Sequence, residues 1–212
     1  MRIPKKIIKS NPSYAVVVDG ETEIWYLQML KRNERDIRVS IKPEIPNKKR
    51  INEQFNLVCE LSEKEFTKVF WVVDFDVVIK EANESPKGKI SPIKTFIKYR
   101  KDLIDKFPNV VVIVNNPCLE FWLLLHFEGN AKYYSNCLSV QKQLKIHLEN
   151  YEKTERYYTK ENDDIYLKLR PYLKTAIENS IALGRFNEDD PEKAKCEMEL
   201  FFHSEALKEH FK

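Results

Sequence analysis

The stretch VFWVVDFD at residues 69–76 decides the fold class of this chain. Its first five residues are apolar and β-branched or aromatic, which predicts a strand over Thr67–Val73. A continuous apolar run of this kind suits a central parallel strand that is covered on both faces. Two acids, Asp74 and Asp76, follow where the strand ends.

Strand and helix patterns alternate on both sides of this stretch. Three further strands are predicted, at Tyr14–Val18, Asp36–Ile45 and Asn109–Val114. Helices are predicted from Glu21, over 51–65, over Ser91–Lys106 and, as an apolar helix, over Cys118–Phe127. Four such alternations predict an α/β fold, with a mostly parallel four-stranded sheet flanked by helices.

Two shorter segments complete the first half of the chain. A loop containing Pro86 and Gly88 is expected to follow Asp76. Ser91 is expected to cap the next helix, with Pro92 at its first position.

The second half of the chain has a different pattern. Helical periodicity is present at 139–149, at 163–183 with an interruption at Pro171, and at 191–209, and no strong strand pattern is found. We therefore expect a single domain over 1–212. An α/β core at 10–127 would carry a helical extension at 128–212.

Overall charge leaves nucleic acid binding open. The 36 Lys and Arg residues nearly balance the 33 Asp and Glu residues, for a net charge of +3. Basic residues gather in 31–50 and 87–106. Such segments either meet phosphate backbones or form solvated faces, and the sequence is compatible with both.

Cysteine usage and hydropathy indicate a cytoplasmic protein with no membrane partner. The four cysteines show no CxxC spacing, so we expect neither a zinc site nor a disulfide framework. Met1–Ser10 is basic but lacks the apolar segment of a signal peptide. The longest apolar run, Leu119–Phe127, is too short to span a membrane.

Acidic side chains follow two of the predicted strands. Asp19 ends the first strand, and Glu23 lies four residues later on the first helical turn. Asp74 and Asp76 are two apart, so an extended chain would place both on one face. Since ligands bind at the carboxyl ends of parallel strands, these acids predict a site for Mg²⁺, Mn²⁺ or Ca²⁺. The alternative is a turn at Asp19 followed by acids that merely favour a helix N-terminus.

Several blocks resemble a known family. They are Val16–Glu23 followed by Tyr26, Trp71–Asp76, and Asn116–Phe127, with the shorter blocks Tyr151–Lys153 and Ala176–Ile177. The block NPCLEFWLLLHF is the most specific, because it resembles the NPCFExWLLLHF block of RloB-like proteins. The first two blocks resemble the two acidic motifs of the wider TOPRIM group.

The resemblance implies a TOPRIM-like fold and metal-dependent cleavage of DNA or RNA. It also implies a role in bacterial defence against phage, often beside an ATPase partner. The corresponding hypothesis is two-metal phosphodiester hydrolysis with Mg²⁺ or Mn²⁺. Asp19 and Glu23 would hold one ion, and Asp74 and Asp76 the other. Lys153 would offset transition-state charge.

Residues of the most specific block are further candidates for the site. Glu120, near the start of its helix, is a candidate catalytic residue, whereas His126 lies six residues later on another helix face. Asn115 and Asn116 would either orient a ligand or cap the helix.

One residue departs from the TOPRIM pattern, which has glutamate where this chain has Asp19. The aspartate carboxylate falls back by roughly 1.5 Å, about one C–C bond. A water molecule or Glu21 could fill the gap, or the site binds metal weakly. The alternative function is therefore an inactive binding subunit that docks on an ATPase. Primase or topoisomerase chemistry is disfavoured, since no additional zinc or DNA-gate region is found.

Overall fold

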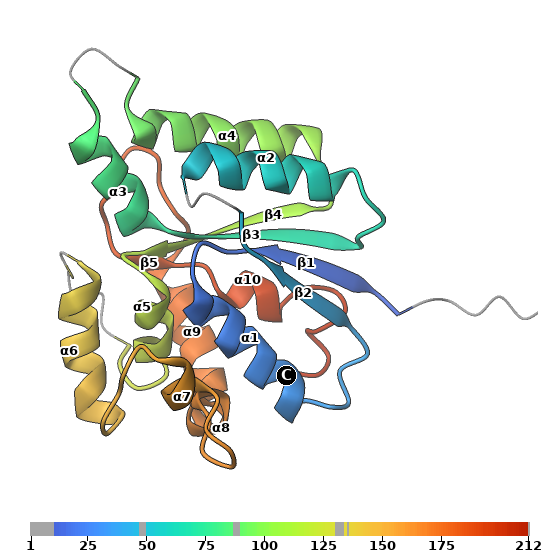
Figure 1. Ribbon diagram of the computed structural model, residues 1–212, viewed down its shortest axis with the longest axis vertical. Coiled ribbons are helices and arrows are strands. Elements are labelled where there is room, and N and C mark those ends of the chain that lie inside the picture. Colours follow the sequence, from blue (N-terminus) through green and yellow to red (C-terminus); the bar gives the residue numbers. More distant parts are fainter. Residues whose placement is uncertain (1–10, 47–49, 87–89, 130–133, 135, 212) are drawn as a thin grey trace, which may run out of the picture.

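A five-stranded sheet forms the centre of the molecule (Figure 1). The computed structural model describes residues 11–46, 50–86, 90–129, 134 and 136–211. The strands are β1 (Ser13–Val17), β2 (Ser40–Glu44), β3 (Lys68–Asp74), β4 (Val110–Asn116) and β5 (Lys195–Cys196), in the spatial order β2-β1-β3-β4-β5. The first four strands are parallel, and β5 runs antiparallel to β4. The α/β class and the mostly parallel sheet are confirmed.

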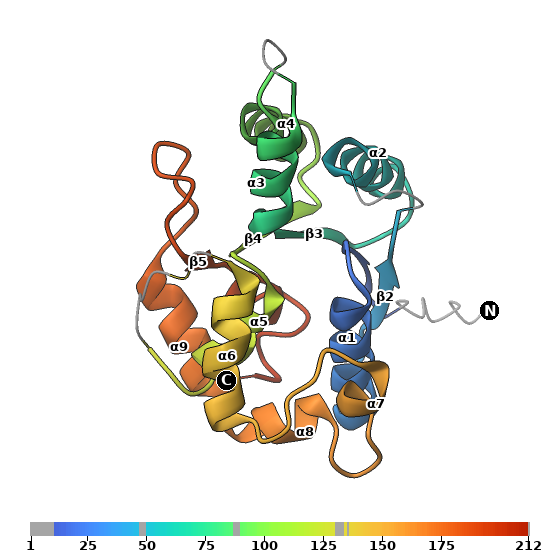
Figure 2. The same cartoon turned by 60° about the vertical axis from the view of Figure 1, so that its left-hand side comes forward.

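Helices cover both faces of this sheet (Figures 1 and 2). One face carries α2 (Ile51–Ser62), α3 (Phe75–Glu84) and α4 (Pro92–Lys106). The other face carries α1 (Glu21–Asn33), α5 (Leu119–Leu125), α9 (Leu173–Leu183) and α10 (Glu199–Phe202). Three further helices close the lower part of this second layer: α6 (Cys137–His147), α7 (Glu155–Tyr158) and α8 (Ile165–Leu169).

Strand β3 is central, as its apolar run predicts. Val69, Trp71 and Val73 point into the core under α2, α3 and α4, and Phe70 and Val72 point into the core on the other face. All five are at most 3% exposed. A strand buried on both faces needs no polar alternation, which is why the sequence of β3 is continuously apolar.

The predicted strand count of four is wrong, because β5 adds a fifth strand. It pairs Cys196 with Asn115 and Lys195 with Asn116. Two residues are too few to produce a recognisable alternation. The strand forms because tertiary contacts bring it to the edge of β4.

The predicted loop after Asp76 is also largely wrong, since α3 occupies most of that segment. Phe75 is fully buried, with its ring 5.6 Å from Phe96 and 5.2 Å from Phe186, and this anchor turns the chain directly from strand into helix. Helix α4 begins at Pro92 as expected, but the Ser91 side chain makes no capping hydrogen bond.

Helix predictions in the second half are partly confirmed. The 139–149 pattern corresponds to α6, and the 163–183 pattern to α8 and α9, separated at Pro171 by a 3-10 turn. The prediction over 191–209 is mostly wrong, because only α10 and β5 form there. Residues 1–10, on which the signal-peptide expectation rests, and 87–89 lie outside the described part of the chain. No helix in the described part is both long and apolar enough to cross a membrane.

Candidate metal centre

Three carboxylates converge at the carboxyl ends of β1 and β3. Asp19 follows β1, Glu23 lies on the first turn of α1, and Asp74 is the last residue of β3. Each of these residues is at most 8% exposed. Because β1 and β3 are neighbours, one oxygen from each carboxylate lies within 4.8 Å of the others. The predicted convergence of strand ends is confirmed for these three acids.

The turn between β1 and α1 shapes this cluster through close approach. A Cβ atom on Gly20 would lie 2.5 Å from Oε2 of Glu23, which is closer than atoms pack. The neighbouring hydroxyl, Oγ1 of Thr22, donates a hydrogen bond of 3.1 Å to the same oxygen. Glycine at position 20 therefore leaves the space that the Glu23 carboxylate occupies.

Replacing Gly20 by alanine is expected to weaken divalent-metal binding about tenfold, the cost of one displaced ligand interaction of roughly 1.4 kcal/mol. The fold should persist, because Gly20 has ordinary extended angles (φ −134°, ψ 163°) and the clash is with a movable side-chain end. Isothermal titration with Mn²⁺ measures the affinity, and circular dichroism checks the fold. Asp102→Ala, at an exposed position on α4 that does not line the pocket, is the matched control. Unchanged affinity in Gly20→Ala would show that the close approach does not position Glu23.

A pocket of about 500 Å³ opens over the cluster. Its described lining carries five acids and one cation, and the aromatic Trp25 forms part of the wall. The charged lining residues are Asp19, Glu21, Glu23, Asp74, Asp76 and Lys153. The pocket is therefore strongly acidic, although the chain as a whole is slightly basic.

Burial and mutual repulsion disfavour the charged forms of these acids. The pKa of Glu23 is raised from 4.5 to about 7, first by burial and then by the charge of Asp19. The pKa of Asp74 is raised well above its ordinary value, by burial and then by Glu23 and Asp19. Oδ1 of Asp74 is buried and has no hydrogen-bond partner among the described residues.

These features fit a hard divalent cation. An ion with oxygen ligands would neutralise the repulsion and supply the missing partner of Asp74. The donors are carboxylate oxygens, which suit Mg²⁺ or Mn²⁺ better than a thiophilic metal. The acids Asp19, Glu23 and Asp74 would hold such an ion.

Asp76 and Glu21 lie beside this cluster. Asp76 is on the first turn of α3, so the expectation that an extended chain aligns it with Asp74 is wrong. Its backbone N–H donates to the carbonyl of Pro117 at 3.1 Å. Burial raises the pKa of Asp76, and Lys153 opposes that rise. Glu21 is exposed at the pocket rim.

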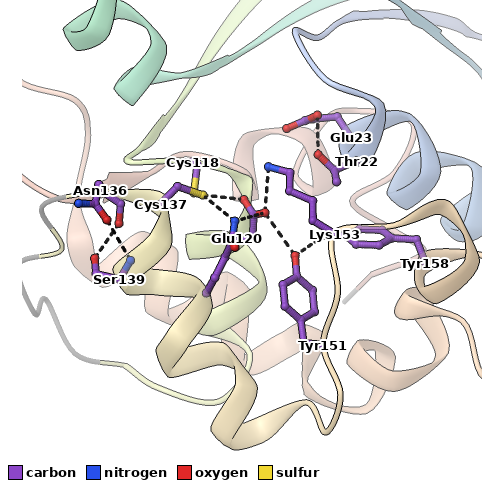
Figure 3. The surroundings of a disulfide bond; sticks show 11 residues. Thr22, Glu23, Cys118, Glu120, Asn136, Cys137, Ser139, Tyr151, Lys153 and Tyr158 are labelled. Atoms are coloured by element: carbon purple, nitrogen blue, oxygen red, sulfur yellow. Dashed lines mark hydrogen bonds and ion pairs between the residues drawn. A yellow bond between two sulfur atoms is a disulfide. The ribbon is translucent and has the colours of Figure 1, made fainter.

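Glu120 lies behind the pocket wall and holds Lys153 (Figure 3). Its side chain is fully buried, and Nζ of Lys153 lies 2.9 Å from Oε1. Gln141 and Tyr151 donate to the same oxygen at 3.1 and 3.3 Å. Burial acts to lower the pKa of Lys153, but Glu120 and the other carboxylates outweigh it, so the pKa is raised. Glu120 thus positions a lysine that lines the pocket.

Asn115 and Asn116, just before and at the start of the NPCLEFWLLLHF block, have structural roles that differ from those expected. Neither asparagine caps α5, which contradicts the capping prediction. Asn116 donates to the carbonyls of Pro191 and Lys193, and Asn115 accepts from the Cys196 thiol. Both therefore attach the β5 segment to β4.

His126 is a structural residue that lies away from the pocket. Its Nδ1 lies 3.0 Å from the carbonyl of Trp122, and burial lowers its pKa to about 4. The imidazole is therefore neutral and held within the core.

A disulfide joins Cys118 to Cys137, which corrects the expectation that the cysteines stay unpaired (Figure 3). Their Cα atoms are 5.8 Å apart although 19 residues separate them in sequence. The spacing carried no signal because packing of α5 against α6 brings them together. Both cysteines line the acidic pocket.

The fold and the site together define a class: α/β proteins with a cluster of buried acids at the carboxyl ends of parallel strands. This chain belongs to the RloB-like protein family, which it matches over residues 14–202. The resemblance to RloB-like proteins is thereby confirmed. No curated protein and no solved structure matches the chain.

Proposed function

We propose that this protein is a TOPRIM-like, Mg²⁺- or Mn²⁺-dependent nuclease. The observation that carries the proposal is the buried cluster of Asp19, Glu23 and Asp74, whose ligand oxygens lie within 4.8 Å of one another. Such a cluster is unstable without a cation, and divalent ions at clustered carboxylates commonly serve phosphoryl chemistry.

The acids of the cluster, Asp76 and Lys153 would have distinct roles in phosphodiester hydrolysis. Asp19, Glu23 and Asp74 would hold one ion, and Asp76, which lines the same pocket, would help to hold a second. Bound divalent ions supply an activated water molecule and stabilise the leaving oxygen. Lys153, fixed by Glu120, would offset the charge that develops on the phosphate.

The described residues of the two basic segments do not line the pocket. Arg35 and Arg38 lie beyond the end of α1, whose 13 residues begin at the site and extend about 20 Å from it. Lys94, Lys98 and Lys101 are exposed on α4. Nucleic acid would therefore be drawn to these outer surfaces, while the metal centre engages a single phosphodiester.

Cleavage assays test the proposal directly. Full-length protein with Mn²⁺ or Mg²⁺ is expected to cleave plasmid, single-stranded DNA or tRNA. Asp74→Asn and Asp76→Asn should each reduce the rate about 100-fold or more, the scale of losing transition-state stabilisation of roughly 3 kcal/mol. Asp102→Asn, at an exposed site on α4, is the matched control.

The proposed setting is bacterial defence against phage, beside an ATPase partner, as the RloB-like resemblance implies. Assays are therefore run alone and, where an ATPase is encoded next to the gene, also with that ATPase. No cleavage with any metal, alone or with that partner, would contradict the nuclease. That result would favour the alternative of an inactive docking subunit, which the shorter side chain of Asp19 supports.

A further inference from the structure

The disulfide forms part of the pocket wall and is accessible from one side. Cys118 precedes α5 and is 1% exposed, whereas Cys137 begins α6 and is partly exposed. Cys59 and Cys196 are the free cysteines of the described chain. Cys137 is the less buried of the two bonded cysteines, so attack by an external thiol is expected at its sulfur.

This sulfur also contacts the residue that holds the pocket lysine. Sγ of Cys137 lies 3.0 Å from Oε2 of Glu120, while Oε1 receives Lys153, Gln141 and Tyr151. A disulfide sulfur has no hydrogen and cannot donate, whereas a thiol can. The redox state of Cys137 therefore decides whether Oε2 of buried Glu120 receives a hydrogen bond from it.

We propose that Cys118–Cys137 is a redox modification site for a dithiol reductant, and that its state sets how firmly Glu120 holds Lys153. A thiolate of the reductant attacks Sγ of Cys137, the S–S bond breaks, and Cys118 leaves as a thiolate that takes a proton. The second thiol of the reductant then displaces Cys137 from the mixed disulfide. Two electrons and two protons pass to the protein, and the reductant becomes a disulfide.

The two states differ at Lys153. In the disulfide state, the bond links α6 covalently to α5, and Gln141 keeps its hydrogen bond to Glu120. The Glu120 carboxylate then interacts with Lys153 through Oε1. After reduction, the Cys137 thiol donates to Oε2 and takes a share of that charge. The link between the two helices is also released. Lys153 is then held less firmly by Glu120 and can interact with an anion in the pocket. The reduced protein is therefore the form competent for the proposed cleavage.

The test follows thiols and Lys153 in the same sample. Full-length protein is equilibrated in mixtures of oxidised and reduced dithiothreitol, then alkylated and examined by mass spectrometry. Cys118 and Cys137 are expected to become alkylated together in a single transition. A brief pulse of acetic anhydride should modify Lys153 about threefold faster in the reduced protein, the change expected for losing roughly half of a hydrogen bond to a charged group. Exposed Lys101 should be unaffected.

Two variants separate redox state from the loss of a side chain. Cys118→Ala leaves a permanent thiol at Cys137 and should react like the reduced protein under both conditions. Cys137→Ala removes both donor and disulfide, so Lys153 should also stop responding to oxidant. Absence of the disulfide under oxidising conditions, or equal Lys153 reactivity in both states, would overturn the proposal.

The last readout rests on the proposed nuclease. If cleavage occurs, oxidation should slow it about threefold in the wild-type chain, in line with the same hydrogen-bond share, and not in Cys118→Ala. A protein that cleaves nothing leaves the alkylation and acetylation results intact. The two proposals therefore fail independently.

Discussion

Replacing Asp74 by asparagine is expected to stabilise the metal-free protein and to remove its stabilisation by metal. The carboxylate of Asp74 is buried beside Glu23 and Asp19, and its Oδ1 has no partner within the described chain. A neutral amide of the same shape relieves this repulsion. We expect a gain of about 1–2 kcal/mol at pH 8, the usual cost of a buried unsatisfied group. For a chain of this size, the melting temperature would rise by roughly 4 °C.

Metal binding should reverse the order of stability of the wild-type protein and the Asp74→Asn variant. At a Mn²⁺ concentration of 100 times the Kd, the wild-type protein gains about 2.7 kcal/mol, whereas the variant that lacks a central ligand gains little. Differential scanning fluorimetry with EDTA and with Mn²⁺ measures both effects. Asp102→Asn should behave like the wild type in each condition. A metal-induced shift of equal size in Asp74→Asn would show that the ion binds elsewhere.

The metal-free protein is also expected to lose stability as the pH rises from about 4.5 to 7. The pKa of Glu23 is raised from 4.5 to about 7, so the folded state binds more protons than the unfolded state in this window. The unfolding free energy therefore falls as pH rises, and the stability present below 4.5 is lost by about pH 7. Glu23 alone would contribute a change of order 3 kcal/mol. Asp74, whose pKa is also raised, acts in the same direction.

Urea unfolding in EDTA between pH 4.5 and 8 measures this decline. Saturating Mn²⁺ should oppose it, because metal binding requires the deprotonated carboxylates and strengthens with pH. Glu23→Gln removes the titrating group and should flatten the metal-free profile. Unfolding free energies that rise with pH across this window in the metal-free wild type would contradict the electrostatic description of the cluster.

The central sheet and its acids follow from the sequence for clear physical reasons. A strand buried on both faces must be apolar throughout, so β3 was visible as an uninterrupted run at Val69–Val73. The end of such a strand is where solvent and ligands gain access, so Asp74 could be placed. Asp19 and Glu23 were found for the same reason, as a strand end and the first turn of a helix.

Features that depend on long-range packing could not be predicted from the sequence. Strand β5 has only two residues, and α3 starts where buried Phe75 anchors the chain. Glu120 and Lys153 could be singled out from the sequence, but their neighbour Gln141 could not. It reaches Glu120 across 21 residues. The Cys118–Cys137 pair depends likewise on how α5 and α6 meet.

The acids at the ends of β1 and β3 are expected to hold a divalent ion. Crystals grown with Mn²⁺ and measured at the manganese absorption edge test it most directly. We predict an anomalous peak coordinated by the carboxylates of Asp19, Glu23 and Asp74, at about 2.1–2.3 Å from their oxygens, which lies between the distances typical of Mg²⁺ and of Ca²⁺. An anomalous map with no peak at this cluster, at a pH above 7 and with saturating Mn²⁺, would contradict it.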